Sequence, residues 1–215
     1  MTPVRPLVPH EHLRTWLGAD AAAALDTMVA DVAADPARIG RVFPGAARRT
    51  RRGPLPAYGD TVLGEDAVRV ELVAAAAGVL GPAALSAELR ALYRFGDSDE
   101  KRAVLHALNG IQPDAVLDGS GLLLDALRTN DTRLVAAAMG AHAARLADDA
   151  WRQGVLKCLF TGVPVARVAG LRDRADDVLA GMVSRYAEER RAAGRDLPDD
   201  VATVLDACTA ATREA

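Results

Sequence analysis

The chain has 215 residues, a formal net charge of -3 and 26% charged residues. A chain of this length can bury a core without disulfides or structural metals. The balanced charge argues against a nucleic-acid-binding protein, which usually carries a broad basic excess. Alanine accounts for 45 of the 215 residues and aromatic residues for only 4%. Because alanine is the best helix former, we expect an all-α protein.

No segment for export or membrane insertion is visible. Residues 1–6 contain no apolar region, and no later stretch offers about 18 uninterrupted apolar residues. Cys158 and Cys208 lie far apart in helical patterns, so we expect both to be thiols in a reducing compartment. We therefore expect a cytoplasmic protein with no transmembrane segment and no nucleic-acid partner.

A single helical domain is predicted over residues 1–215, and its first part, 1–82, combines N-terminal helices with a long loop. The helical periodicity predicts helices at 11–17, 20–33 and 65–80. The loop, near residues 43–64, is rich in Pro, Gly and Arg. Long loops often bind ligands, but a solvated basic loop is the commoner case, and the sequence does not decide its role.

Residues 83–215 have the pattern of stacked antiparallel helix pairs, as in HEAT or TPR repeats. Two helices meet at residues 95–97, and more are predicted at 121–128, 131–146, 151–160, 172–194 and 199–212. The turns centre on Gly96, Asn130 and Gly162, which are 34 and 32 residues apart. This spacing is typical of a helical repeat, in which turns one pair apart lie on the same edge. We therefore expect the residues around these turns to form one rim.

The densest polar cluster, residues 93–102, lies at the first of these turns. Asp97 is expected to cap the following helix, with Glu100 completing a capping box. Two carboxylates and a basic residue at a helix start could also hold a divalent cation such as Mg²⁺, or act as general acid and base. Asp97 and Asp99 are thus catalytic candidates, although neither a cofactor nor a metal is identified.

His142 is a third catalytic candidate. It falls on the apolar face of the predicted helix 131–146, where a hydrogen-bonded core histidine is the commoner role. The common motifs for phosphate loops, dinucleotides and zinc are missing from the sequence.

The other two turns also carry polar residues. Asn130 can adopt a left-handed conformation, and Asp131 can cap the next helix. Lys157 is one of two lysines, against 24 arginines. A lysine in such a chain suggests a need for a compact charge or a titratable amine, although chance retention explains it equally well.

Four sequence blocks occur in a distinctive order. They are YRFGDSDEKR at 93–102, DALRTND at 125–131, VLKCLFTGVP at 155–164 and YAEERRAAGR at 186–195. Together they resemble the EboA domain family, over roughly Leu85 to Leu205. Arg152 and residues 174–177 differ from the asparagine-bearing pattern of that family.

The resemblance implies a biological context and no particular reaction. Family members are encoded in bacterial clusters with prenyltransferase-like, sugar-phosphate-cyclase-like and hydrolase-like proteins, which are linked to making or exporting specialised metabolites. The resemblance thus implies an accessory protein that binds a small anionic or isoprenoid intermediate, or a cluster-encoded partner enzyme. We expect the ligand to bind at the predicted rim, through the residues there that also match the family: Tyr93, Arg94, Asp97, Asp99, Lys101, Arg128, Asn130, Asp131 and Lys157.

Two alternatives remain open at this point. In the first, the protein is an enzyme, such as a cyclase or isomerase, that uses a rim carboxylate as acid or base in an apolar pocket. In the second, the motif residues serve only the fold, and caps such as Asp97 and Asp131 contribute about 1 kcal/mol each.

Overall fold

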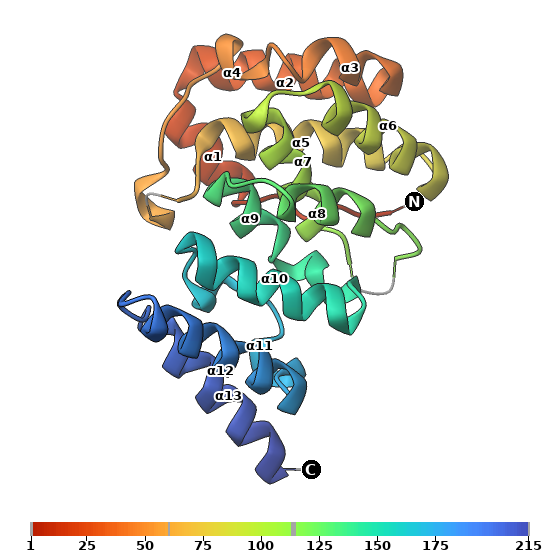
Figure 1. The fold of residues 1–215 in the computed structure, drawn as a ribbon. Coiled ribbons are helices and arrows are strands. Elements are labelled where there is room, and N and C mark those ends of the chain that lie inside the picture. Colours follow the sequence, from red (N-terminus) through yellow and green to blue (C-terminus); the bar gives the residue numbers. More distant parts are fainter. Residues whose placement is uncertain (1, 60, 113–114, 215) are drawn as a thin grey trace. The chain divides into compact units, whose positions relative to one another are not determined.

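The computed structural model describes residues 2–59, 61–112 and 115–214, with side chains up to residue 210. In these ranges we find thirteen α-helices, four short 3-10 helices and two isolated β-bridges, without a strand (Figure 1). The all-α prediction is confirmed. The chain forms two compact units that meet between Leu122 and Leu123, and each unit is described by itself. The single domain and the continuous helical repeat stay predictions.

The N-terminal unit contains all the helices predicted for its sequence, with their ends shifted by at most a few residues. Its helices are α1 (His10–Leu17), α2 (Ala19–Ala34), α3 (Ile39–Val42), α4 (Ala46–Arg49), α5 (Gly64–Ala77), α6 (Pro82–Phe95), α7 (Ser98–Asn109) and the first residues of α8 (Ser120–Leu127).

Helix α5 forms the centre of this unit and contacts α1, α2, α3, α4, α6 and α7. Twelve of its fourteen residues are buried, so this helix is surrounded on nearly all sides. The buried charged residues are Glu65, Asp66, Arg69 and Glu71. An unpaired buried charge is costly, and each of these residues has a partner on another element. Glu71, for example, accepts a hydrogen bond from Arg14 of α1 at 3.1 Å.

Asp66, Arg69, Asp99, Glu100 and Arg102 form what we call the buried charge network, between α5 and α7. Arg102 donates to both carboxylate oxygens of Asp66, at 2.7 and 3.1 Å, and to Asp99 at 2.7 Å. Arg69 lies 3.7 Å from Glu100. The network joins the two central helices by charged hydrogen bonds, which are stronger than neutral ones.

The basic loop at 43–64 packs against the unit. Gly53 donates its backbone N–H to the Glu65 carboxylate at 2.9 Å. The Arg51 guanidinium lies 4.6 Å from the centre of the Trp16 ring and donates to the Trp16 carbonyl at 2.7 Å. The loop also contains α4 and a 3-10 turn, short helical elements that its composition does not predict.

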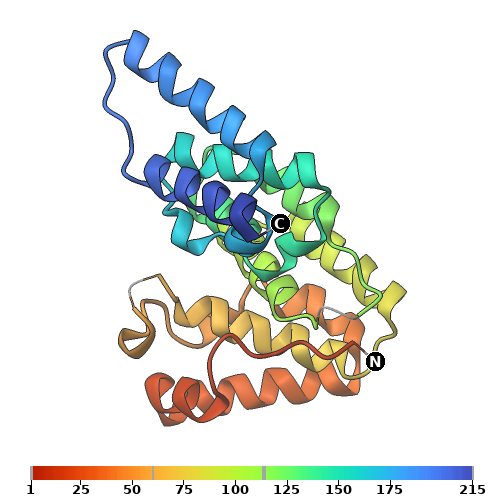
Figure 2. The same cartoon turned by 90° about the horizontal axis from the view of Figure 1, so that it is seen from below.

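The C-terminal unit contains the rest of α8 and five further helices. These are α9 (Thr132–Ala138), α10 (Asp148–Thr161), α11 (Leu171–Arg174), α12 (Asp177–Ala192) and α13 (Asp200–Glu214). Helices α12 and α13 pack as a pair joined by residues 193–199 (Figure 2).

Two long predicted helices are shorter than expected. The helix predicted at 131–146 ends at Ala138, because Gly140 has an extended backbone and a 3-10 turn follows it. The helix predicted at 172–194 is split into α11 and α12. Asp176 has an extended backbone at the split and caps α12 by accepting the Leu179 N–H at 2.8 Å. Aspartate is a favoured N-cap, and this local preference outweighs the helical periodicity of the segment.

The core of this unit is centred on Trp151 of α10, which is fully buried. Its indole N–H donates to the Ala169 carbonyl at 3.1 Å, and the Arg174 guanidinium lies 4.9 Å from the ring centre. Cys158 and Cys208 are both buried thiols, and the thiol state is the one predicted. Burial raises the pKa of the Cys158 thiol to about 12, so this sulfur stays protonated at neutral pH.

Candidate functional site

Five of the predicted rim residues lie in the N-terminal unit, around the turn between α6 and α7. Asp97 caps α7 by accepting the Glu100 N–H at 2.9 Å, and Glu100 accepts the Asp97 N–H in return at 3.3 Å. The predicted capping box is confirmed. Lys101 lies 5.3 Å from the centre of the Tyr93 ring, a cation–π distance. Arg94 makes a similar contact with the exposed ring of its neighbour, Phe95.

The carboxylate of Asp99 belongs to the buried charge network through its hydrogen bond to Arg102. In the described part of the chain, no group of three or more His, Cys, Asp or Glu side chains is arranged to hold a metal ion. Asp97 and Asp99 both take part in interactions that stabilise α7 and its junction with α5.

The other four predicted rim residues lie in the C-terminal unit. Asp131 caps α9, and its hydrogen bonds with Arg133 lower the pKa of its carboxyl group. Arg128 pairs with Asp125 at 2.8 Å on the surface. Asn130 does not adopt the predicted left-handed conformation. Its side-chain oxygen instead accepts a hydrogen bond from Lys157 at 2.8 Å, so two of the four residues meet directly.

His142 is buried, with an exposed fraction of 3%. It lies in the 3-10 helix Ala141–Arg145 and not on a continuation of α9, so the predicted helical placement is wrong. The nine rim residues are divided between the two units, five and four. Their convergence on one rim therefore stays a prediction.

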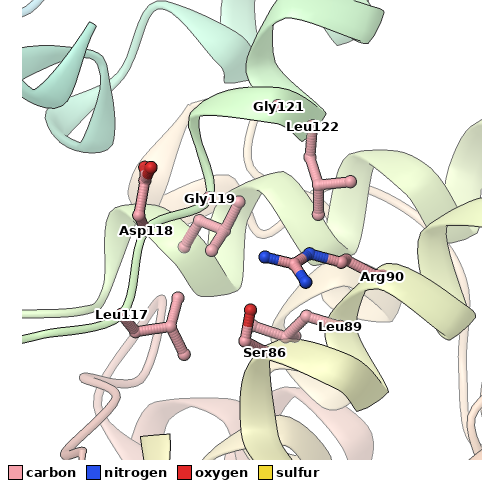
Figure 3. Close-up of a pocket in the computed structure, with 9 residues that line it drawn as sticks. Ser86, Leu89, Arg90, Leu117, Asp118, Gly119, Gly121 and Leu122 are labelled. Carbon is pink, nitrogen blue, oxygen red and sulfur yellow. The ribbon is translucent and has the colours of Figure 1, made fainter. Parts of the chain in front are cut away.

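A small pocket of about 100 Å³ occurs in the N-terminal unit, beside α6. Figure 3 shows the Arg90 guanidinium and the Ser86 hydroxyl pointing into it, between Leu117 and Leu122. The Asp118 carboxylate turns away and accepts the Ser120 N–H at 2.8 Å. Ligand pockets usually measure about 300 to 1,000 Å³, so this space is smaller than a typical small-molecule site.

A larger depression, which we call the α10/α12 groove, lies within the C-terminal unit. Its volume of about 410 Å³ falls within the range of small-molecule sites. Four residues from each helix form its walls, and in both helices they follow i, i+3, i+4, i+7 spacing, so they share one helical face. They are Gln153, Leu156, Lys157 and Phe160 of α10, and Met182, Arg185, Tyr186 and Glu189 of α12.

Two contacts hold α10 and α12 side by side in the same direction. Near their N-terminal ends, Arg152 donates to Asp176 at 3.1 Å. Nearer their C-terminal ends, Tyr186 donates its hydroxyl to the Leu159 carbonyl at 3.3 Å.

The chemistry of the groove is amphipathic. Leu156 and Met182 are half-buried, and 69% of Phe160 is exposed. Among residues 2–59, 61–112 and 115–210, no ion pair involves the groove residues Lys157, Arg185 or Glu189. The groove therefore presents two cations and one carboxylate beside aromatic and aliphatic surface.

The sequence pointed to Lys157 but missed Arg185 and Glu189. In the structure Phe160 is exposed, while Met182 and Tyr186 are half-buried. The repeated i, i+3, i+4, i+7 spacing on two neighbouring helices was the available signal. It could not be used without knowing which helices are neighbours.

A family model described as "Metabolite traffic protein EboA" matches residues 85–206. The chain belongs to the EboA family. The matched segment runs from α6 into α13 and includes every residue of the α10/α12 groove, so the groove is part of the EboA domain. No curated protein and no solved structure matches the chain.

None of the helices in the described residues is both long enough and apolar enough to cross a membrane.

Proposed function

We propose that this EboA-family protein is an accessory protein of bacterial specialised metabolism that binds a small anionic or isoprenoid intermediate in the α10/α12 groove. It would hold the intermediate in the cytoplasm and pass it to an enzyme encoded in the same cluster. The observation that carries the proposal is a groove of about 410 Å³ in which Lys157 and Arg185 lie beside Phe160 and Tyr186.

The two cations supply the anion-binding half of the site. Lys157 uses one of its three donors on the neutral amide of Asn130, so two donors remain for a ligand. Arg185 can donate two parallel hydrogen bonds to a carboxylate or phosphate. Neither side chain forms an ion pair with a carboxylate in the described residues, so both remain available to an anionic ligand.

The aromatic side chains supply the apolar half. The Tyr186 ring is held at two points, by its hydroxyl on the Leu159 carbonyl and by the Arg190 guanidinium, 5.8 Å from the ring centre. A wall that is already fixed costs little entropy when a ligand binds. The half-buried Leu156 and Met182 extend this apolar surface.

The same contacts favour a binding role over acid–base catalysis at the predicted carboxylates. A general acid or base must reach the proton that it transfers. Asp97 is committed to the cap of α7, and Asp99 to Arg102. In the groove, by contrast, Lys157, Arg185 and Glu189 form no ion pairs among the described residues.

The proposal is tested by thermal unfolding and calorimetry with prenyl diphosphates, cyclitol phosphates and aromatic acids. A ligand at one hundred times its dissociation constant should add about 2.7 kcal/mol and raise Tm by about 5 to 11 °C. Lys157→Met and Arg185→Met should each weaken binding about tenfold or more, because each removes a charged hydrogen bond.

The matched control is Arg172→Met, which removes an exposed arginine of α11 that does not line the groove. This variant should bind like the wild type. If no compound of the panel binds, or if all three variants bind equally well, the groove is not the site.

A further inference from the structure

The charges of the α10/α12 groove do not suit every anion equally. Lys157 and Arg185 supply two positive charges, and Glu189 supplies one negative charge in the same groove. The net charge of +1 matches a ligand with one negative charge. A phosphate monoester or a diphosphate carries more negative charge than this and would face the Glu189 carboxylate as well as the cations.

The parallel arrangement of the helices places Glu189 at one end of the groove. The pairing of Arg152 with Asp176, and of Tyr186 with Leu159, sets the register of the helices. In this register Glu189, one turn beyond Tyr186, lies toward the same end as Phe160, and Gln153 lies toward the opposite end.

Glu189 has no ion-pair partner among the described residues, so its oxygens can accept hydrogen bonds from a ligand. Glu189 lines the groove together with Phe160 and Tyr186, so this acceptor lies beside the aromatic side chains against which a flat ligand would pack. A ligand with an O–H or N–H group on a flat apolar body would satisfy it. A doubly charged phosphate held by the two cations would instead be repelled by the Glu189 carboxylate more strongly than a singly charged carboxylate would.

We infer that Glu189 is a specificity-determining residue that selects flat, singly charged carboxylates carrying a hydrogen-bond donor and rejects phosphate esters and diphosphates. This inference rests on the proposed function, because it names the ligand class of the same groove. Attraction comes from Lys157 and Arg185, and discrimination comes from the opposing charge, as specificity often requires.

The test compares two probes that share one ring system, 6-hydroxy-2-naphthoate and 2-naphthyl phosphate, by calorimetry at constant ionic strength. The wild type should bind the carboxylate at least about fivefold more tightly than the phosphate. In Glu189→Gln, binding of the phosphate should improve about fivefold more than binding of the carboxylate, because the phosphate carries the extra negative charge and glutamine can still accept the hydrogen bond.

Glu188→Gln is the matched control, since Glu188 is the adjacent exposed glutamate and does not line the groove. It makes the same change in net charge and should leave the ratio of the two affinities unchanged. Geranate and geranyl diphosphate, compared in the same way, test whether selection by charge extends to an isoprenoid body.

The possible results separate the inference from the proposed function. If both probes bind and depend on Lys157, but Glu189→Gln leaves their ratio unchanged, the selective role of Glu189 is wrong and the groove remains the site. A wild-type preference for the phosphate also overturns the inference. If neither naphthyl probe binds and the wider panel also fails, the proposed function itself fails.

Discussion

Two clusters of charged residues, one in each unit of the chain, have opposite surroundings. In the N-terminal unit, the carboxylates and guanidinium groups of the buried charge network pair with one another where α5 meets α7, and Arg102 contacts two carboxylates at once. In the C-terminal unit, Lys157, Arg185 and Glu189 line an open groove and form no ion pairs among the described residues. Residues of the same chemical type therefore hold two helices together in the network and form no ion pairs in the groove.

The comparison predicts that breaking the network has the largest effect on stability. Asp66→Ala leaves the Arg102 guanidinium with only one of its two carboxylate partners, in a site where its side chain is 4% exposed. We expect a loss of about 3 to 5 kcal/mol in the free energy of unfolding, measured by urea titration. The double variant Asp66→Ala, Arg102→Met should lose less than the sum of the two single variants, because it leaves no buried charge unpaired. Additive losses would show that the pair is not coupled.

The pH dependence of stability sharpens the same comparison. Burial raises the pKa of Asp66 to about 6 from an ordinary value of 3.8, although the hydrogen bonds and charge of Arg102 oppose this shift. The folded protein thus holds this proton more tightly than the unfolded chain does. Protonated Asp66 therefore adds to the free energy of unfolding, by up to about 3 kcal/mol. This contribution is fully present below about pH 4 and is lost as the pH rises through about 6.

The measurement is the free energy of unfolding of the wild type minus that of Asp66→Asn, between pH 3.5 and 7.5. The subtraction cancels the contribution of the other carboxyl groups to the pH dependence. One of them is Asp131, whose lowered pKa makes the protein more stable as the pH rises. A flat difference curve would mean that Asp66 titrates normally in the folded protein.

A smaller effect is expected at the helix cap. Asp97→Ala removes the acceptor for the Glu100 N–H and should lower the free energy of unfolding by about 1 kcal/mol. Ser98→Ala, at the neighbouring exposed position, should change it by less than about 0.5 kcal/mol. Equal effects of the two substitutions in urea titrations would contradict the capping role.

The smallest effect on stability is expected in the groove. Lys157→Met removes an exposed hydrogen bond to Asn130, and should change the free energy of unfolding by less than about 0.5 kcal/mol. Its ligand affinity should nevertheless fall about tenfold or more, measured by calorimetry on the same preparation. A large loss of stability would place Lys157 with the structural charges and remove the contrast between the two units.

The local parts of the fold could be predicted from the sequence. Alanine content, periodicity and caps gave the all-α class, most helix positions and the Asp97 capping box, because these depend on interactions over a few residues. The breaks at Gly140 and Ala175 were missed. The helical periodicity places both Gly140 and Asp176 inside predicted helices. In the structure Gly140 has an extended backbone, and Asp176 after Ala175 is the N-cap of α12.

The candidate site was predictable only in part, because its walls come from two helices that are separate in the sequence. Lys157 stood out by its rarity, and its contact with Asn130 joined two of the predicted residues. Arg185 and Glu189 were not distinguishable from the many other charged positions of α12. The pairing of Arg102 with Asp66 could not be predicted from local sequence patterns either, because the two residues are 36 positions apart.

The position of the tryptophans has a practical consequence. The sequence contains only two, Trp16 in the N-terminal unit and Trp151 in the C-terminal unit. Trp151 is sealed in its core, whereas Trp16 is half-buried beneath Arg51. The two tryptophans should therefore differ in the wavelength of their emission maximum and in their accessibility to quenchers. Each unit carries its own built-in reporter, and replacing either indole with phenylalanine would let the melting of the other unit be followed optically.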